Sequence, residues 1–155
     1  MSKGDYPILN LPDFSERVKF RINDKGKREI FDPVRASWVA LTPEEWVRQN
    51  MTFFISERLG IPLHRFSNEA SIEYNGLSKR CDAIILGDDA KPMIIVEYKQ
   101  PKVAITQKVF DQIAVYNMQL NVPYLIVSNG LQHLMCMVDR ESHRYIFTDK
   151  LNYNG

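Results

Sequence analysis

The chain has 155 residues, the length of one domain of ordinary size. Hydrophobic residues make up 45% and charged residues 25%, with only 7 Gly and 8 Pro, which excludes collagen-like, low-complexity and disordered chains. With 20 Lys and Arg against 19 Asp and Glu, the net charge of +1 favours neither an acidic nor a basic partner. A nucleic-acid-binding surface would therefore have to be a local patch.

Neither a membrane span nor a signal peptide is predicted. The longest apolar runs, such as 83–86, have four or five residues, and the start of the chain at 1–5 has no apolar core. Cys81 and Cys136 lie in apolar segments and form no CxxC pair, which indicates buried, reduced thiols and a cytoplasmic protein. The three histidines are far apart in sequence, which argues against a zinc site.

The first 40 residues are predicted to form an N-terminal extension with a β-hairpin. Residues 18–22 alternate between apolar and polar, residues 23–26 have turn chemistry, and residues 28–31 form the returning strand. No repeat or linker follows, so we expect one domain over residues 1–155, with the extension at 1–40 and the core at 41–148.

A strong helix start opens the core. Thr42 can cap the helix, Pro43 suits its first position, and Glu45 completes a capping box. Gly60 ends the helix in the usual way for a C-terminus. Between them, an apolar stripe with helical spacing is formed by Val47, Met51, Phe54, Ile55 and Leu59.

The rest of the core is predicted to alternate strands with one more helix. A strand–helix–strand passage favours a parallel strand pair with a right-handed crossover, so we expect a mixed sheet covered by helices. The predicted strands are Ala70–Tyr74, Arg80–Leu86, Met93–Lys99, Pro123–Ser128, Leu134–Val138 and Arg144–Phe147, and the predicted helix is Thr106–Leu120.

Two acids stand out against this apolar pattern. Residues 93–96 form an apolar run typical of a central strand, yet Glu97 and Lys99 follow it on the face of Ile95. If the preceding hairpin closes symmetrically, Leu86 lies opposite Met93, Ile84 opposite Ile95, and Asp82 opposite Glu97. Directly opposed residues have Cβ atoms roughly 5 Å apart. A slip of one residue would separate the acids.

Paired carboxylates at the end of an apolar sheet suit a hard cation. Mg²⁺ takes one or two carboxylates and keeps several waters, which fits Asp82 and Glu97. Lys99, one step further on the same face, can hold an anionic substrate oxygen or orient a water. Taken singly, each of these charges is typical of a solvated strand end; their mirrored positions in one hairpin favour a site.

Three further residues are predicted to lie near this site. Gln112 and Tyr116 are four residues apart on the second helix, on the stripe of Val109 and Ile113, so we expect them to face the sheet. The alternative is that both sit at the edge of that face. Glu44 borders the apolar face of the first helix, although an acid in a first turn also matches the helix dipole.

These residues resemble a known nuclease signature. Asp82 followed by Glu97-Tyr98-Lys99 resembles the PD-(D/E)xK motif, and Gln112-x-x-x-Tyr116 resembles the QxxxY element of its RecB-like branch. Residues 42–49 and 110–117 also resemble the N-terminal nuclease region of type I restriction enzyme R subunits, and the likeness runs over about residues 31–147. The proline that usually precedes the Asp is replaced by Cys81.

The resemblance implies a restriction-endonuclease-like αβββαβ core and Mg²⁺-dependent cleavage of DNA. It implies Mg²⁺, with Mn²⁺ as a substitute, at Asp82, Glu97 and the backbone carbonyl of Tyr98. Lys99 would be the catalytic lysine and Glu44 the first-helix acid. It further implies that Gln112 and Tyr116 support the lysine and contact the nucleic-acid backbone, and that DNA and other restriction-system or helicase subunits are the partners.

Several alternatives stay open. No GxxxxGK[ST] loop occurs, so we expect no ATPase motor in this chain. The rival to an active nuclease is a non-catalytic module that keeps the fold and binds nucleic acid or protein. The oligomeric state is not predicted. Four basic residues flank the candidate site and can contact phosphates: Lys79, Arg80, Lys102 and Lys108.

Overall fold

The computed structural model describes residues 6–154, which form two α-helices, nine strands and one short 3-10 turn. Their bounds are β1 (Phe20–Ile22), β2 (Arg28–Asp32), β3 (Ser37–Ala40), α1 (Pro43–Leu59), the 3-10 turn (Leu63–Arg65), β4 (Phe66–Tyr74), β5 (Leu77–Leu86), β6 (Pro92–Tyr98), α2 (Gln107–Gln119), β7 (Tyr124–Ser128), β8 (His133–Asp139) and β9 (Arg144–Thr148).

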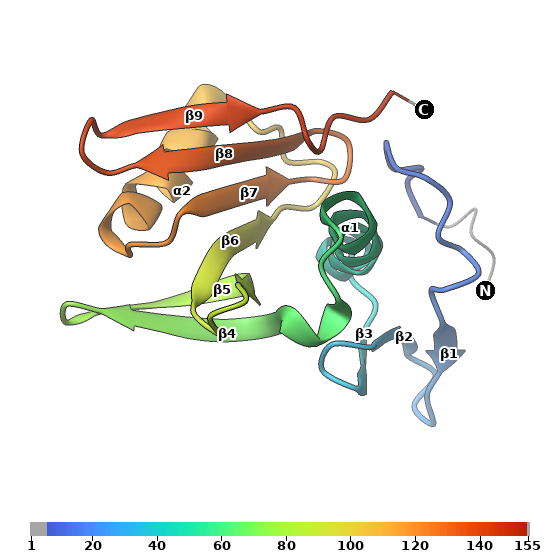
Figure 1. Cartoon of the computed structure of the whole chain (residues 1–155). Coiled ribbons are helices and arrows are strands. Elements are labelled where there is room, and N and C mark those ends of the chain that lie inside the picture. The colour runs from blue at the N-terminus through green and yellow to red at the C-terminus, as the bar shows by residue number, and fades with distance from the viewer. Residues whose placement is uncertain (1–5, 155) are drawn as a thin grey trace.

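The core is a mixed six-stranded sheet in the order β4-β5-β6-β7-β8-β9 (Figure 1). Strands β6 and β7 run parallel, joined through α2, and the other neighbours run antiparallel. The order α1-β4-β5-β6-α2-β7 is the αβββαβ order that we predicted, so the expected fold class is confirmed. Strand β4 begins at Phe66 rather than at Ala70, which extends the β4–β5 hairpin.

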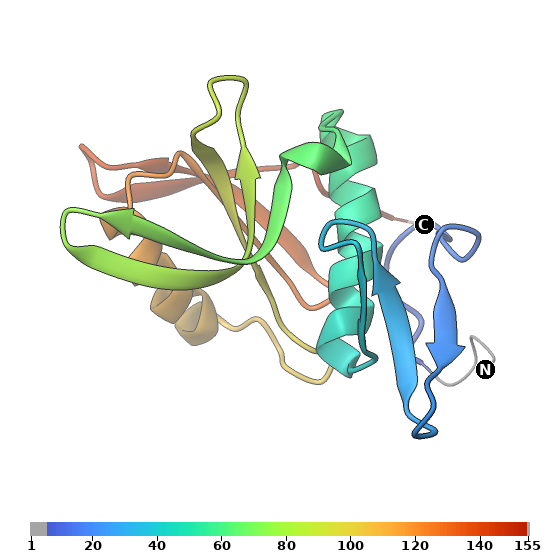
Figure 2. The ribbon, with the colours of Figure 1, turned by 90° about the horizontal axis from the view of Figure 1, so that it is seen from below.

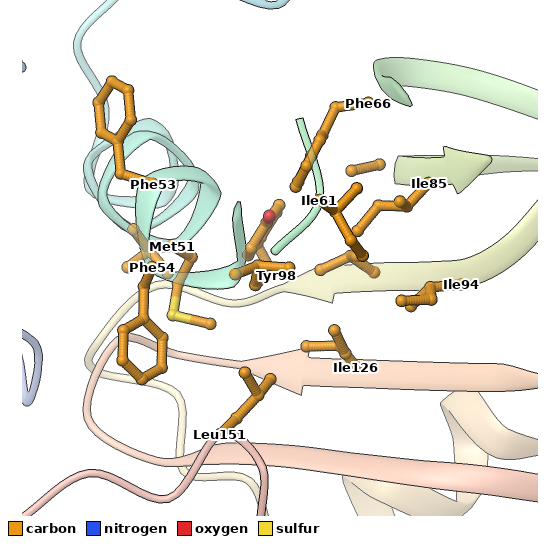
Figure 3. Packing of buried hydrophobic residues seen from close by; sticks show 14 of the residues in the cluster. Met51, Phe53, Phe54, Ile61, Phe66, Ile85, Ile94, Tyr98, Ile126 and Leu151 are labelled. Atoms are coloured by element: carbon orange, nitrogen blue, oxygen red, sulfur yellow. The ribbon is translucent and has the colours of Figure 1, made fainter. Parts of the chain in front are cut away.

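The two helices cover opposite faces of this sheet. Strand β6 shows why: Val96 and Tyr98 belong to the apolar cluster with α1, whereas Ile95 belongs to the cluster with α2. Figure 3 shows Tyr98 beside Met51 of α1. Alternation along the strand puts Glu97 on the face of Ile95, toward α2.

Helix α1 begins and ends where its sequence signals predict. The hydroxyl of Thr42 accepts the backbone N–H of Glu45 at 3.1 Å, and Pro43 is the first helical residue. Gly60 follows the helix with φ 65°, a left-handed conformation that glycine adopts without steric cost. These caps fix the position of the first turn of α1, which carries Glu44.

Helix α2 is rotated relative to our prediction. Its buried face consists of Phe110, Ile113, Ala114 and Asn117. Tyr116 is 55% exposed and Gln112 is also exposed, so the prediction that they face the sheet is wrong. The ring of Phe110 and the small side chain of Ala114 pack closely on the sheet, and this turns Tyr116 outward.

The N-terminal extension forms a three-stranded antiparallel sheet in the order β1-β2-β3, packed on the far side of α1 from the main sheet (Figure 2). The β1–β2 hairpin agrees with our prediction, whereas β3 was not predicted. Ile30 is completely buried in the cluster with α1 and anchors the extension. Within residues 6–154, no helix is long and apolar enough to cross a membrane.

Candidate functional site

The register of β5 and β6 brings Asp82 toward Glu97. The strands pair Ile84 with Ile95 and Ala83 with Val96, the register that we predicted. The pairing ends there, and Asp82 and Glu97 are the next residue along each strand. At the turn end the prediction was wrong: an irregularity after Ile85 pairs Leu86 with Pro92 instead of Met93. This shift lies on the turn side of the correct pairs, so it leaves the acids in register.

The carboxyl groups of Asp82 and Glu97 are close neighbours. The Asp82 carboxylate accepts the backbone N–H of Tyr98 at 2.8 Å, which brings its negative charge beside the neighbouring residue Glu97. Burial and the negative charge of Asp82 together raise the pKa of Glu97 to about 7, despite an opposing contribution from Lys79. Two partly buried anions in contact favour a proton, a cation or a metal ion between them.

Lys79 supplies a cation in this structure. Its Nζ lies 2.7 Å from Oε1 of Glu97, and the pair is largely shielded from solvent. The same Nζ lies 5.3 Å from the ring centroid of Tyr116. From the sequence we predicted that Lys79 contacts phosphate. In the structure it pairs with Glu97, a candidate metal ligand. Its contact with the Tyr116 ring also places Tyr116 near the site.

Lys99 and Glu44 lie in the same electrostatic neighbourhood. The backbone N–H of Lys99 donates to the carbonyl of Ser128 at 2.8 Å, and its side chain makes no ion pair within the described part of the chain. Burial and the charge of Asp82 raise the pKa of Glu44, while Arg48 and Lys99 act in the opposite direction. A carboxylate oxygen of Glu44 lies 3.9 Å from the guanidinium of Arg48, which also donates to the Asp82 carbonyl, so Glu44 lies at the edge of the site, which we call its mouth.

Arg48 was not predicted as part of the site. It is 1% exposed, and its guanidinium donates hydrogen bonds to the backbone carbonyl of Asp82 and to the carboxylate of Glu69. Its Nε lies 3.3 Å from a carboxylate oxygen of Glu45. The sequence offered one signal, the two acids a turn earlier in the helix, because a buried arginine needs such partners.

Glu69 is the second residue that sequence reasoning missed. Strand β4 pairs Asn68 with Ala83 and Ala70 with Cys81, which leaves Glu69 opposite Asp82. Its φ of 54° is unusual for a side chain larger than glycine, and such strain clusters at functional sites. Arg48 and Arg80 lower the pKa of its carboxyl, although burial opposes them.

The donor set fits a hard cation with water ligands. In an extended strand the N–H and C=O of one residue point to the same side, so the Tyr98 carbonyl, like its N–H, points toward Asp82. Two carboxylates and one carbonyl leave positions for water, as Mg²⁺ prefers. Within residues 6–154, no group of three or more His, Cys, Asp or Glu side chains is arranged around a metal position.

A cleft of about 370 Å³ lies at the start of α1. Arg48 and Glu69 line it, whereas Asp82, Glu97 and Lys99 do not. Gln112, exposed on α2, makes no hydrogen bond or ion pair within the described residues. The residues that line the cleft are Thr42, Pro43, Glu44, Glu45, Arg48, Glu69 and Gln100.

Comparison with known families agrees with this architecture. The family model described as type I restriction enzyme R protein N terminus matches residues 43–151, from the start of α1 to just beyond β9. The chain belongs to this family. The R protein N-terminus match covers every strand of the main sheet and both helices, and so confirms the resemblance seen in the sequence. Neither the curated proteins nor the solved structures compared with the chain gave a match.

Proposed function

We propose that this R protein N-terminal domain hydrolyses phosphodiester bonds of DNA in a Mg²⁺-dependent reaction. The observation that carries the proposal is the convergence of Asp82 and Glu97 at the end of two apolar strands, where the Asp82 carboxylate accepts the N–H of Tyr98, the residue next to Glu97. Two partly buried acids near each other are costly unless cations offset both charges, and Lys79 pairs with Glu97 alone. The family supports DNA as the substrate class, because restriction enzymes act on DNA.

Each residue has a role that its position allows. Asp82, Glu97 and the Tyr98 carbonyl would hold Mg²⁺, which when bound activates water and neutralises charge on the scissile phosphate. Lys99, next to this donor set, donates hydrogen bonds to a phosphate oxygen or to the attacking water. Glu44 adds a carboxylate at the mouth of the site. Other restriction-system subunits are the proposed protein partners.

The test is cleavage of plasmid and linear DNA in a titration with Mg²⁺ and Mn²⁺, with Lys99→Ala in parallel. Lys91→Ala, which removes an exposed lysine from the β5–β6 turn, is the matched control. We expect metal-dependent cleavage that Lys99→Ala abolishes and Lys91→Ala retains. Equal activity of all three proteins would show that the cleavage does not come from this site.

A non-catalytic module is the second candidate, and one contact favours it. The ion pair between Lys79 and Glu97 already neutralises a buried carboxylate, so the fold is satisfied without a metal. Such a module would bind DNA or a partner protein through the same face. Absence of Mg²⁺ and Mn²⁺ binding at millimolar concentration would favour this candidate over the nuclease.

A further inference from the structure

The N-terminal sheet carries an excess of positive charge that the net charge conceals. Residues 17–40, which we name the basic sheet, contain seven Lys or Arg and three Asp or Glu. The remainder of the chain contains 13 Lys or Arg and 16 Asp or Glu. The local positive patch expected for a nucleic-acid-binding protein of neutral charge is therefore on β1, β2 and the loops beside them.

Two cations of the basic sheet lie over aromatic rings. The guanidinium of Arg21 lies 4.6 Å from the ring centroid of Trp38, and Lys19 lies 6.0 Å from that of Phe31. The two rings contact each other edge-on at 5.3 Å. Cation–π contacts hold the charges in place while leaving them at the surface. Because the cations cover the rings, this face suits phosphate contacts better than stacking of unpaired bases.

Two more lysines stand at the tip of the hairpin. Lys25 and Lys27 are exposed, and neither forms an ion pair within the described residues. The side chain of Asn23 accepts the backbone N–H of both, at 2.9 Å, so the turn that presents them is ordered. Free ammonium groups on an ordered turn are available to a polyanion.

The candidate site supplies little of this attraction itself. Three of its cations are paired with acids, Lys79 with Glu97 and both Arg48 and Arg80 with Glu69, which leaves Lys99 for a phosphate. Without a metal, the clustered carboxylates repel phosphate. Nucleic-acid affinity requires unpaired cations elsewhere on the same rigid body.

A buried network attaches the basic sheet to the helix of the candidate site. Arg35 donates to Asp32 at 2.5 Å and to Glu45, in the first turn of α1, at 2.6 Å. Asp32 is completely buried and also accepts the side-chain N–H of Asn68 in β4 at 2.9 Å. Figure 2 shows the β1–β2 turn at the end of the molecule where α1 begins. The sheet and Glu44 are thus held in a fixed relation.

We propose that the basic sheet binds the sugar–phosphate backbone of duplex DNA beside the candidate site. The inference rests on the proposed function for its ligand class, but it concerns binding and needs neither metal nor cleavage. Lys19, Lys25 and Lys27, which form no ion pair within the described residues, contact phosphates along one flank of α1, and the duplex then lies against the mouth of the site. Arg21, paired with Glu29 at 2.8 Å, holds the strands of the sheet together.

The experiment measures binding of the whole chain to a fluorescent 30-base-pair duplex in EDTA at several salt concentrations. The variant is Lys25→Ala/Lys27→Ala. The matched control is Lys91→Ala/Lys150→Ala, which removes two exposed lysines from outside the basic sheet. Loss of two phosphate contacts should make the plot of log association constant against log salt concentration less steep by about 2 units of slope. It should also weaken binding about tenfold near 0.1 M salt. The control variant should stay close to wild type.

Equal losses in both variants would overturn the inference, because they would reflect net charge alone. Absence of DNA binding by the wild type would overturn it as well and leave an acidic protein as the partner to test. Failure of the proposed function would be seen separately. If DNA binding depends on Lys25 and Lys27 but no cleavage occurs in Mg²⁺, then the basic sheet binds DNA and the nuclease proposal is rejected.

Discussion

The backbone N–H of Tyr98 donates a 2.8 Å hydrogen bond to the carboxylate of Asp82. This bond joins Asp82 to β6 at Tyr98, whose neighbours in the chain are Glu97 and Lys99. The spacing of all three side chains therefore depends on the pairing of two strands rather than on a loop, and strands hold site geometry more precisely than loops do. Removing either carboxylate should change ion binding and leave the fold intact.

Asp82→Asn should remove Mg²⁺ binding while preserving the fold. The Asn side-chain oxygen can still accept the N–H of Tyr98, so only the charge is lost. We expect at least a tenfold fall in Mg²⁺ affinity by calorimetry and an unchanged circular dichroism spectrum. Asp88→Asn, at an exposed position in the β5–β6 turn, is the control. Equal affinities for both variants would place the ion elsewhere.

Lys79→Met should increase Mg²⁺ affinity, by about tenfold if the lost ion pair is worth about 1.4 kcal/mol. The Lys79 ammonium contacts Glu97 and must leave before that carboxylate can bind a metal ion. Calorimetry of wild type, Lys79→Met and the control Lys102→Met measures the difference. A weaker affinity in Lys79→Met would mean that Lys79 orients Glu97 for the ion rather than competing with it.

Arg48→Met should destabilise the protein by about 3 kcal/mol, because it leaves Glu69 and the Asp82 carbonyl without their buried donor. Urea denaturation measures the free energy of unfolding. Arg58→Met, on an exposed position of the same helix, should change it by less than about 1 kcal/mol. Comparable values for the two variants would show that the Arg48 network contributes little.

His133 should make stability depend on pH. Burial lowers its pKa below the usual 6.5; its Nδ1 accepts from Ser128 at 2.7 Å and its Nε2–H donates to the Asn10 carbonyl at 2.8 Å. The folded state then binds fewer protons than the unfolded state. This contribution is complete above pH 6.5 and is lost as the pH falls through the folded pKa, by up to about 1.4 kcal/mol per pH unit.

The measurement is urea denaturation from about 1.5 pH units below the usual histidine pKa to about one unit above it, between about pH 5 and pH 7.5. Wild type and His64→Gln, which alters an exposed histidine, should share one pH profile. Glu97, whose pKa is raised to about 7, contributes with the opposite sign in every variant and cancels from the comparison. The free energy of unfolding of His133→Gln relative to wild type should therefore rise toward pH 5. A parallel pH dependence in all three proteins would assign the effect to other groups.

The elements of this fold could be predicted because their signals are local. Thr42, Pro43 and Gly60 bound α1 through capping chemistry that acts over a few residues. The register near Asp82 could also be predicted, since the apolar runs on either side of residues 87–92 permit few pairings. The candidate metal pair followed from that register alone.

The features that escaped prediction depend on tertiary contacts. Asn117 is completely buried while Tyr116 is 55% exposed, an inversion of polarity that sequence patterns cannot show. The left-handed backbone of Glu69 and the burial of Arg48 depend on each other, because each side chain is the other's partner. Neither the backbone conformation of Glu69 nor the burial of Arg48 can be predicted from sequence, because both arise only when α1 packs against β4.

The most direct test of the central claim is a crystal structure grown with Mn²⁺, with anomalous diffraction data. We expect one anomalous peak between the carboxylates of Asp82 and Glu97, about 2.1 Å from an oxygen of each, with the Lys79 ammonium moved away from Glu97. A map without a peak at this position at millimolar Mn²⁺, with Lys79 still paired to Glu97, would contradict the metal site.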